Sequence, residues 1–421
     1  MLHLPTLLIQ VAIIILLARV AGGLVRKLGQ PQVVGEMIAG LALGPSLLGW
    51  LSPQVSMALF PPESLGYLST LSQFGLLLFM FLVGLEFNPK VLSGRGHSAI
   101  VTSHASIIAP FFLGTLLALY LYPRLSDESV SFLHFALFLG TAMSITAFPV
   151  LARILIERQL LRSKVGTVAI ACAAVDDVTA WIILAGVVLL VRTNAVGAPL
   201  ALTFAGSLLY VAIMLWGVRR IMGRLGNVFR REGAVTTELF ALIVLLILGS
   251  SLITELLGIH ALFGAFLLGV VMPKDYDFVR LLSEKLESFV TVLLLPLYFA
   301  FTGLRTSLNL LTNVEMWSWC LLIIGVAVLG KFGGAALSAR VTGLSWRDAG
   351  AIGILMNTRG LMELVILNIG LDIGAISPAL FTMMVLMALV TTFMSTPLLE
   401  LFYPAKLRWR DLPEVGAAET V

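Results

Sequence analysis

Hydrophobic runs of about twenty residues recur along the whole chain, and this feature limits its possible folds more than any other. Each run is long enough to cross the roughly 30 Å hydrocarbon core of a bilayer as an α-helix. The runs are continuous and rich in Leu, Ile, Ala and Gly. A membrane β-barrel would instead show shorter segments in which apolar and polar residues alternate. The sequence therefore predicts an all-α protein that crosses a membrane many times.

Composition excludes several other classes of protein. Hydrophobic residues make up 59% of the chain and charged residues only 12%, whereas soluble domains carry roughly 25% charged residues. The two cysteines, Cys172 and Cys320, lie inside apolar runs and have no metal-ligand spacing, so we interpret them as buried thiols. The sequence has no nucleophile–base constellation and no phosphate-binding glycine loop. We expect neither an enzyme nor a bound cofactor.

Thirteen candidate transmembrane helices can be placed along the chain. They cover approximately residues 4–25, 32–49, 66–87, 98–122, 132–155, 165–191, 198–218, 236–257, 259–273, 287–309, 315–339, 348–371 and 378–402. The first run lacks a basic segment before it and a small-residue cleavage site, so it is interpreted as a retained helix and not as a signal peptide. We expect a single transmembrane domain over residues 1–421, with a short tail at 403–421 and no soluble regulatory domain.

The loop charges predict the orientation of these helices. With the N-terminus outside, the outside loops keep only Arg124 and Arg192. The inside loops then hold Arg26, Lys27, Lys90, Arg95, Arg153, Arg158, Arg162, Lys164, the basic stretch 219–231, Lys274, Arg280, Lys285, Arg340, Arg347, Lys406, Arg408 and Arg410. This asymmetry follows the positive-inside rule and puts the C-terminus in the cytoplasm. It predicts a multi-pass protein of the cell (inner) membrane, and it explains the basic pI without a nucleic-acid partner.

The two halves of the chain resemble each other. A shift of 219 residues superimposes Gly84-Leu85 on Gly303-Leu304 and Glu86 on Arg305; Gly35 and Gly40 match Gly264 and Gly269, and 140–150 parallels 353–363. The pattern predicts one repeat at about 4–191, a connector helix at about 198–218 and a second repeat at about 236–402. The odd number of helices between equivalent positions makes the repeats inverted, which is typical of secondary transporters.

Two of the predicted helices are interrupted near their midpoints. One break spans 144–149, where Pro149 removes a backbone donor, and the other spans 357–360. Half-helices that end inside a membrane direct their dipoles at the space between them. Both breaks are therefore expected to face one central cavity, where such transporters bind their substrates.

Four ionisable residues lie near the midpoint of a predicted helix: Asp176, Asp177, Lys331 and Arg359. Charges at this depth are costly, so each is a candidate functional residue. Two adjacent carboxylates cannot both ionise easily in a dehydrated site, and the one that stays poised can hold either a proton or a hard cation. We predict that Asp177 carries the proton or monovalent cation and that Lys331 pairs with Asp176. The alternative is a static ion pair that fixes the helices, although buried pairs stabilise poorly.

Several further residues have two possible roles. Thr146 and Ser144 either supply oxygen ligands to a cation or form hydrogen bonds between helices. Arg359 either compensates the carbonyls freed at the helix breaks or pairs with Glu363 one turn later. Glu86 and Arg305 either pair with each other or simply meet the membrane interface. Glu36 and Glu255, near helix ends, are expected to be solvated.

Five segments resemble the monovalent cation:proton antiporter-2 family, and most closely its plant cation/H+ exchanger and yeast K+/H+ antiporter branch. They are GEMIAGLALGPSLLG, GTAMSITAFPVLARIL, AAVDDVTAWIIL, PLYFAFTGLRTSL and LMNTRGLMELVILNIGLDIGAISPALFTMMVLMALVTTFMSTPLL. The resemblance covers about residues 5–403. It implies a thirteen-helix sodium/proton-antiporter-type fold, a homodimer in the lipid bilayer, and an elevator-like motion of one domain against the other.

The resemblance also implies roles for individual residues. Asp177 matches the family's ion-binding aspartate, and Thr146 lies in the first crossed helix. Lys331 looks like the lysine that pairs with the other aspartate in electrogenic sodium/proton exchangers, whereas Kef-type potassium efflux relatives usually have glutamine where Asp176 stands. The choice between K+ and Na+ as the substrate that accompanies H+, and the stoichiometry, stay open.

Two other functions remain compatible with this fold. A sodium-coupled small-solute symporter would not need a lysine opposite the paired acids. A non-transporting, sensor-like relative would be expected to lose Asp177 or to gain a soluble output domain.

Overall fold

The computed structural model describes residues 4–404, except 88–96, 128–129, 159, 161–162, 197–199 and 259. All regular elements in this part of the chain are helices. They are α1 (Leu4–Lys27), α2 (Gln32–Leu43), α3 (Leu48–Leu51), α4 (Pro53–Leu59), α5 (Pro62–Glu86), α6 (His97–Leu125), α7 (Phe132–Ser144), α8 (Phe148–Glu157), α9 (Lys164–Val196), α10 (Leu200–Ala212), η2 (Ile213–Val218), α11 (Arg219–Glu232), α12 (Thr237–Leu256), α13 (Ala261–Val271), α14 (Tyr276–Phe289), η3 (Val290–Leu294), α15 (Leu295–Leu304), η4 (Leu308–Leu310), α16 (Val314–Val341), α17 (Trp346–Met356), α18 (Leu361–Asp372) and α19 (Pro378–Phe402). The loop residues Lys90, Arg95 and Arg162 and the tail from 405 lie outside the described residues.

Each of the thirteen predicted spans has a helical counterpart. Eleven described helices, some of them composite, are long and apolar enough to cross a membrane, and the bent pair α17–α18 makes a twelfth span. The short apolar helix α13 corresponds to the remaining predicted span, at about 259–273. The seventh span is longer than predicted because α10 continues through η2, a π-helix, into the basic helix α11. The expected all-α membrane fold is confirmed.

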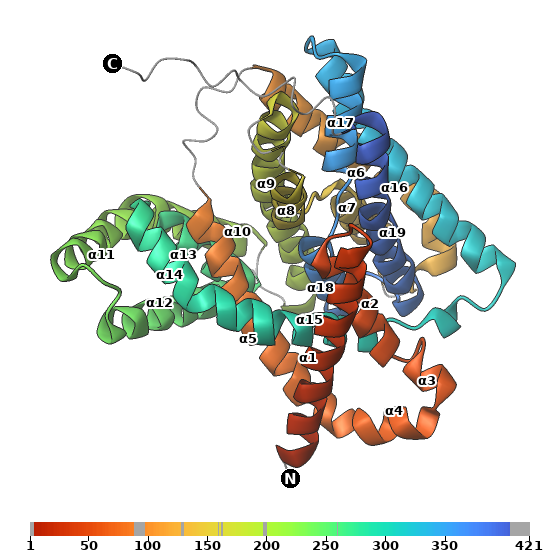
Figure 1. Ribbon diagram of the computed structural model, residues 1–421, viewed down its shortest axis with the longest axis horizontal. Coiled ribbons are helices and arrows are strands. Elements are labelled where there is room, and N and C mark those ends of the chain that lie inside the picture. The colour runs from red at the N-terminus through yellow and green to blue at the C-terminus, as the bar shows by residue number, and fades with distance from the viewer. Residues whose placement is uncertain are drawn as a thin grey trace.

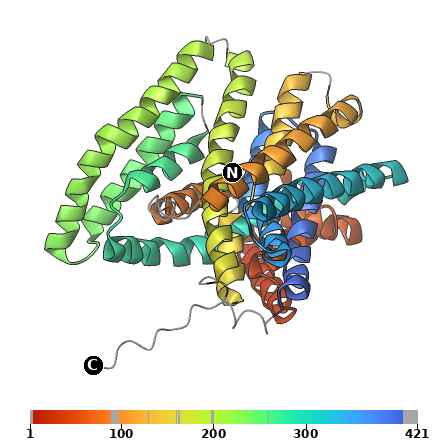
Figure 2. The same ribbon diagram turned by 90° about the horizontal axis from the view of Figure 1, so that it is seen from above.

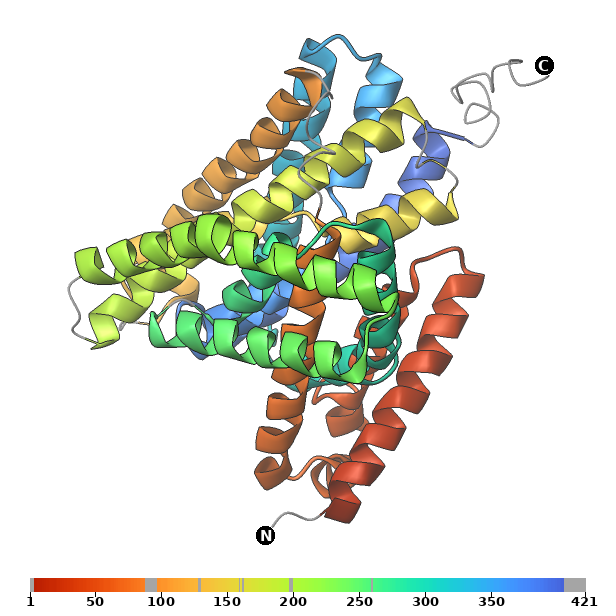
Figure 3. The same ribbon diagram turned by 90° about the vertical axis from the view of Figure 1, so that its left-hand side faces the viewer.

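The helices form two bundles (Figures 1 and 2). In the site bundle, α6 packs against α7, α9 and α16, while α17 contacts α9, α16 and α19. In the scaffold bundle, α2 packs against α1 and α15, and α5 packs against α13 and α15. In chain order the bundles are linked three times, since α5 is followed by α6, α9 by α10, and α15 by α16 after the short helix η4. In Figure 3 the start of α1 and the end of α19 lie toward opposite ends of the molecule, as an odd number of spans requires.

Two close helix crossings in the scaffold bundle depend on glycine. A Cβ on Gly40 of α2 would lie 2.2 Å from the Phe299 carbonyl oxygen of α15, beside Gly303. A Cβ on Gly84 of α5 would lie 2.1 Å from the Phe266 carbonyl oxygen of α13, beside Gly269. Small residues let helix backbones approach this closely inside a membrane. Each crossing pairs a helix of the first half of the chain with one of the second half.

Both predicted helix breaks are present. Residues 145–147 separate α7 from α8, and residues 357–360 separate α17 from α18, which is bent by 44° relative to it. Pro149 lies in the first turn of α8, where its missing N–H is tolerated. The two extended segments are joined by a hydrogen bond of 3.0 Å from the Ala147 amide to the Thr358 carbonyl oxygen. The breaks therefore cross each other at one place.

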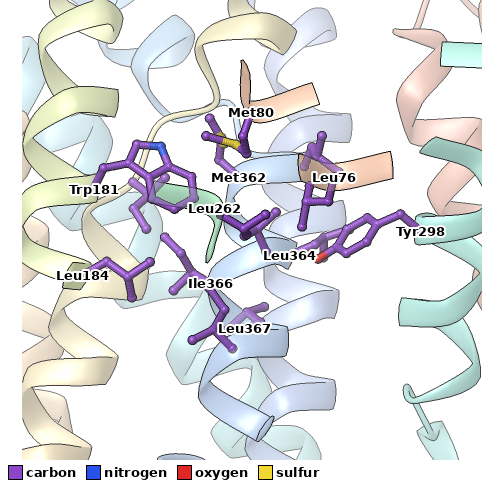
Figure 4. Close-up of a cluster of buried hydrophobic side chains, with 14 of the residues drawn as sticks. Leu76, Met80, Trp181, Leu184, Leu262, Tyr298, Met362, Leu364, Ile366 and Leu367 are labelled. Carbon is purple, nitrogen blue, oxygen red and sulfur yellow. The ribbon is translucent and has the colours of Figure 1, made fainter. Parts of the chain in front are cut away.

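An apolar layer separates the two bundles (Figure 4). Trp181 of α9 and Leu364 of α18 lie on the site-bundle side, and Met80 of α5 and Leu262 of α13 lie on the scaffold side. All four side chains are buried. Contacts of this kind are non-directional, so the surface between the bundles is held mainly by hydrophobic packing.

Candidate functional site

Asp176 is a fully buried carboxylate that is surrounded by donors. The hydroxyls of Ser103 and Ser106 donate to its two oxygens at 2.7 and 2.8 Å. The Thr146 hydroxyl lies 3.0 Å from Oδ2, and Lys331 Nζ lies 2.8 Å from the same oxygen. Four elements of the site bundle, α6, the α7–α8 break, α9 and α16, supply these groups. The Asp176 carboxylate therefore has a complete set of hydrogen-bond and ion-pair partners.

Lys331 is equally well satisfied. Its ammonium also donates to the backbone carbonyl oxygens of Ser106 at 2.9 Å and of Ser144 at 2.5 Å. Because an ammonium has three protons, these two bonds and the ion pair with Asp176 use them all. The pairing predicted from the sequence is present, and Lys331 ties α16 to α6 and to the end of α7.

Ser144 and Thr146 point their oxygens at protein partners in this structure. The Ser144 hydroxyl donates to the Thr141 carbonyl oxygen, and the Ser144 carbonyl is taken by Lys331. The Thr146 hydroxyl lies between Asp176 and the Met356 carbonyl oxygen, 3.1 Å from the latter. Both residues therefore hold the crossing of the two broken helices together. This is the second of the two roles considered above, hydrogen bonding between helices. Their use as cation ligands remains a prediction.

Asp177 has a different environment from its neighbour. It is 4% exposed, and within the described part of the chain neither of its carboxylate oxygens makes a hydrogen bond. The Phe148 amide, in the first turn of α8, faces it without meeting hydrogen-bond geometry. The N-terminus of a helix carries a partial positive charge, which favours an anion there. A buried carboxylate without partners is rare and costly, so Asp177 is the group in this site that most needs an external partner.

Arg359 performs both of the roles considered for it. Its guanidinium donates to the carbonyl oxygens of Ala142 and Met143 at 2.9 and 2.7 Å, and these carbonyls lie in the last turn of α7. The same group pairs with Glu363 at 2.6 Å. Both members of the pair are fully buried. Arg359 therefore satisfies the end of α7 and keeps its net charge balanced by Glu363.

Sequence reasoning missed Ser103 and Ser106. They lie three residues apart on α6, so they face one side of that helix, and both donate to Asp176. The available signal was their spacing of three residues within a predicted membrane helix. Serine is common in membrane helices, so this spacing alone does not separate these two from other serines.

The proposed pairing of Glu86 with Arg305 is wrong. Arg305 pairs with Asp372 at 2.6 Å and donates to the Asn368 side chain at 3.0 Å, both on α18. Glu86 ends α5 beside Lys274, whose ammonium caps α5 through the Gly84 and Leu85 carbonyls. The two residues lie at the ends of different helix crossings, so equivalent positions in the sequence do not meet in space.

The prediction for Glu36 is also wrong. Glu36 is only 8% exposed, and its carboxylate accepts a hydrogen bond of 3.0 Å from the Gln32 side chain. Close packing of α2 between α1 and α15 encloses this end of the helix. Glu255 is exposed as expected, and it accepts a hydrogen bond from the Ala261 amide at the start of α13.

Comparison with known proteins gives consistent results. Residues 12–401 match the family described as "Sodium/hydrogen exchanger, transmembrane". The chain is 42% identical over 400 residues to the Na(+)/H(+) antiporter NhaS4 of Synechocystis, and the alignment covers 95% of this chain and 97% of that protein. It is also 42% identical to cation/H(+) antiporter 17 of Arabidopsis thaliana and 35% identical to K(+)/H(+) antiporter 1 of Saccharomyces cerevisiae.

The plant and yeast relatives are longer proteins. The matches cover 96% and 90% of this chain, but only 49% and 44% of those two relatives. Among solved structures, the sodium proton antiporter MjNhaP1 of Methanocaldococcus jannaschii matches with a TM-score of 0.66 and 14% identity, covering 97% of this chain and 100% of that one. At this identity the match shows a shared fold.

Proposed function

Because the chain belongs to the transmembrane sodium/hydrogen exchanger family, we propose that it exchanges a monovalent cation, K+ or Na+, for protons at Asp177. One observation carries this proposal. Asp177 is buried without a hydrogen-bond partner, directly beside an Asp176 that has four. The relatives named above are sodium/proton, potassium/proton and cation/proton antiporters, which agrees with this assignment.

The exchange follows from the charge balance of the site. Asp176 and Lys331 neutralise each other, and so do Arg359 and Glu363. The carboxylate of Asp177 is then the uncompensated charge of the site, and it is stable at this depth only when a proton or a cation neutralises it. One carboxylate cannot hold both at once. Binding of the cation therefore releases the proton, which is the coupling that antiport requires.

Alternating access is proposed to occur by movement of the site bundle against the scaffold bundle. The apolar layer of Figure 4 supports this, because hydrophobic surfaces can slide without breaking directional bonds. The two glycine crossings support an inverted repeat with the bounds predicted above. Gly40 and Gly84 match Gly269 and Gly303 in the sequence, but in space Gly40 lies beside Gly303 and Gly84 lies beside Gly269. This movement would expose Asp177 to one side of the membrane at a time.

The orientation and the assembly are proposals as well. We place the N-terminus outside and the C-terminus in the cytoplasm of a cell membrane, on the strength of the loop charges. The family resemblance implies a homodimer. Cysteine labelling of intact cells tests the orientation, and cross-linking in native membranes tests the dimer.

The decisive experiment measures proton flux in proteoliposomes on addition of K+, Na+, Li+ or Rb+. Asp177→Asn keeps the size of the side chain, but its uncharged amide neither takes up and releases a proton nor attracts a cation by charge. Cation-driven proton flux should therefore fall to the level of empty liposomes. Glu255→Gln is the matched control, since it makes the same chemical change at an exposed helix end. Full exchange by Asp177→Asn would refute the proposed mechanism.

The same assay separates the two alternatives. A sodium-coupled symporter would show solute uptake and no cation-driven proton release, and a sensor-like protein would show neither. The contact of Lys331 with Asp176 argues against the symporter, which was not expected to need that lysine.

A further inference from the structure

An apolar pocket opens toward the bilayer where the two bundles meet. Its volume is about 340 Å³, and it lies between α9 of the site bundle and the helices α10, α12 and α13. Its walls include Trp181, Ile182, Leu208, Tyr210, Phe263 and Phe266. Ile182 and Leu208 are 68% and 56% exposed, so the pocket has an open side. Because the helices that carry these two residues are candidate membrane spans, the open side faces lipid.

The few polar atoms of the pocket are already satisfied. The Tyr210 hydroxyl lies 2.6 Å from the Ser250 hydroxyl, and the Thr254 hydroxyl donates to backbone carbonyls of its own helix. Water needs two to four polar partners to be stable in a cavity, and apolar cavities stay dry. A pocket of this size with so few polar atoms therefore favours an apolar occupant.

The helix that forms one wall of the pocket becomes strongly basic at one end. α10, η2 and α11 follow one another without a break, and Leu208, Val211 and Leu215 line the pocket. Arg219 and Arg220 follow within the next two turns, and both are exposed. Within the described residues, no ion pair links either arginine to an acidic side chain.

α11 has the character of an interfacial helix. Ile221 and Val228 are exposed apolar residues that lie among the arginines, while Met222 and Phe229 face the protein. Such a helix lies in the headgroup region of a bilayer. In the proposed orientation this region belongs to the cytoplasmic leaflet, which carries the anionic lipids and attracts basic side chains.

We propose that this pocket binds one acyl chain of an anionic glycerophospholipid, whose headgroup phosphate pairs with Arg219 and Arg220. The apolar pocket selects a lipid tail, and the exposed arginines at its basic end select the negative headgroup. Trp181 lies one helical turn after Asp177 on α9. The bound lipid therefore contacts both the helix that carries the ion site and the scaffold, and its occupancy depends on the relative position of the two bundles.

The test uses delipidated, purified full-length protein and native mass spectrometry during titration with phosphatidylglycerol. Gly186 lines the pocket, and a Cβ there meets nothing within 4 Å, so Gly186→Leu fills the pocket without a backbone clash. Bound phosphatidylglycerol should fall at least fivefold. Gly249→Leu is the matched control, because Gly249 is also an open helical glycine but lies outside the pocket, and its lipid binding should stay within twofold of wild type.

The headgroup contact is tested by a second pair of variants. Arg219→Gln/Arg220→Gln should lose the preference for phosphatidylglycerol over phosphatidylcholine. Arg280→Gln/Arg347→Gln removes two other exposed arginines and should keep that preference. Unchanged binding by both Gly186→Leu and Arg219→Gln/Arg220→Gln would overturn the proposal. So would equal binding of the two lipids by wild type, displacement of the lipid by inorganic phosphate alone, or a disulfide between two copies of Leu208→Cys in native membranes, which would make the pocket a protein–protein interface.

Discussion

Asp176 and Asp177 are adjacent in the chain but have opposite environments. Successive residues of a helix point about 100° apart, so one side chain faces α6 and α16 while the other faces the start of α8. Asp176 has four donors, whereas the side chain of Asp177 has no hydrogen bond to any residue that the structure describes. The helical geometry therefore divides a doubled acid into a fixed ion pair and an exchangeable site.

The fixed pair can be tested by removing one partner and then both. Lys331→Met leaves the Asp176 carboxylate buried without its cation, which costs about 3–5 kcal/mol for pairs of this kind. Thermal unfolding in detergent should show this loss. Asp176→Asn/Lys331→Met should be more stable than Lys331→Met, because the orphaned charge is gone. If the double variant lost as much stability as Lys331→Met and Asp176→Asn lose together when measured singly, the two residues would not interact.

At the scale of helices, two kinds of contact position the site: glycine crossings and caps on helix ends. Gly40, Gly84, Gly269 and Gly303 let the scaffold helices cross with their backbones in contact. Arg359 caps α7, and Lys274 caps α5 and α13 through three carbonyl oxygens. These contacts join elements far apart in the chain and satisfy backbone carbonyl groups at helix ends inside the membrane.

A methyl group tests the glycine crossings. Gly40→Ala places a Cβ 2.2 Å from the Phe299 carbonyl oxygen, so α2 and α15 must separate, at a cost of about 1–3 kcal/mol. The melting temperature and the yield of folded protein should both fall. Gly66→Ala, in the open part of α5, has nothing within 4 Å and should be neutral or slightly stabilising. Equal stability of the two variants would contradict a close crossing.

Lys274 gives the stability of the scaffold bundle a pH dependence. Burial and, to a smaller extent, the nearby Arg219 lower the pKa of Lys274 to about 7, although Glu86 acts in the opposite direction. The pKa of an unfolded lysine is about 10.4, so between about pH 7 and pH 10 the unfolded chain binds more protons than the folded one. Stability from this group therefore rises with pH across that window and is constant below it.

The measurement is the melting temperature at pH 7 and pH 9. Lys274→Met loses the helix cap at every pH and should also show a smaller rise than wild type between these two values. Lys285→Met removes an exposed lysine of the same region, which donates to the Val235 carbonyl oxygen, and should keep the wild-type rise. An identical rise for wild type and Lys274→Met would rule out titration of Lys274 in this range.

At the scale of the whole molecule, a polar contact joins the two bundles at one edge of the apolar layer. Arg305, which directly follows α15, pairs with Asp372 of α18, and Asn368 of α18 contacts Tyr298 and Thr302 of α15. The ion pair is partly exposed, with side chains 22% and 46% accessible, so it contributes about 0–1 kcal/mol. That is enough to shift the balance between two bundle positions by up to about fivefold.

Asp372→Asn should therefore leave the melting temperature nearly unchanged but alter the apparent cation affinity in the flux assay by up to about fivefold. Asp277→Asn is the control, since Asp277 pairs with Arg280 inside a single helix and cannot link the bundles. A change of the same size in both variants would mean that the effect comes from surface charge alone.

The sequence predicted much of this arrangement because bilayers permit few solutions. The run lengths gave the helices, Pro149 and the polar segment 357–360 marked the breaks, and the depth of Asp176, Asp177, Lys331 and Arg359 marked the site. The possible pairing of Arg305 with Glu86 and the expected solvation of Glu36 were wrong, because contacts across helices depend on rotation and tilt, which apolar periodicity does not specify.

The amino-acid sequence by itself determined that this chain spans a membrane, where its helices break and which charges lie at mid-depth, because each of these depends on local composition and length. Only the tertiary structure decided which aspartate is paired and which is free. That depends on the direction in which each side chain leaves α9 and on the serines of α6 that meet it. The same packing created the lipid-facing pocket beside Trp181, which no single segment of the sequence contains.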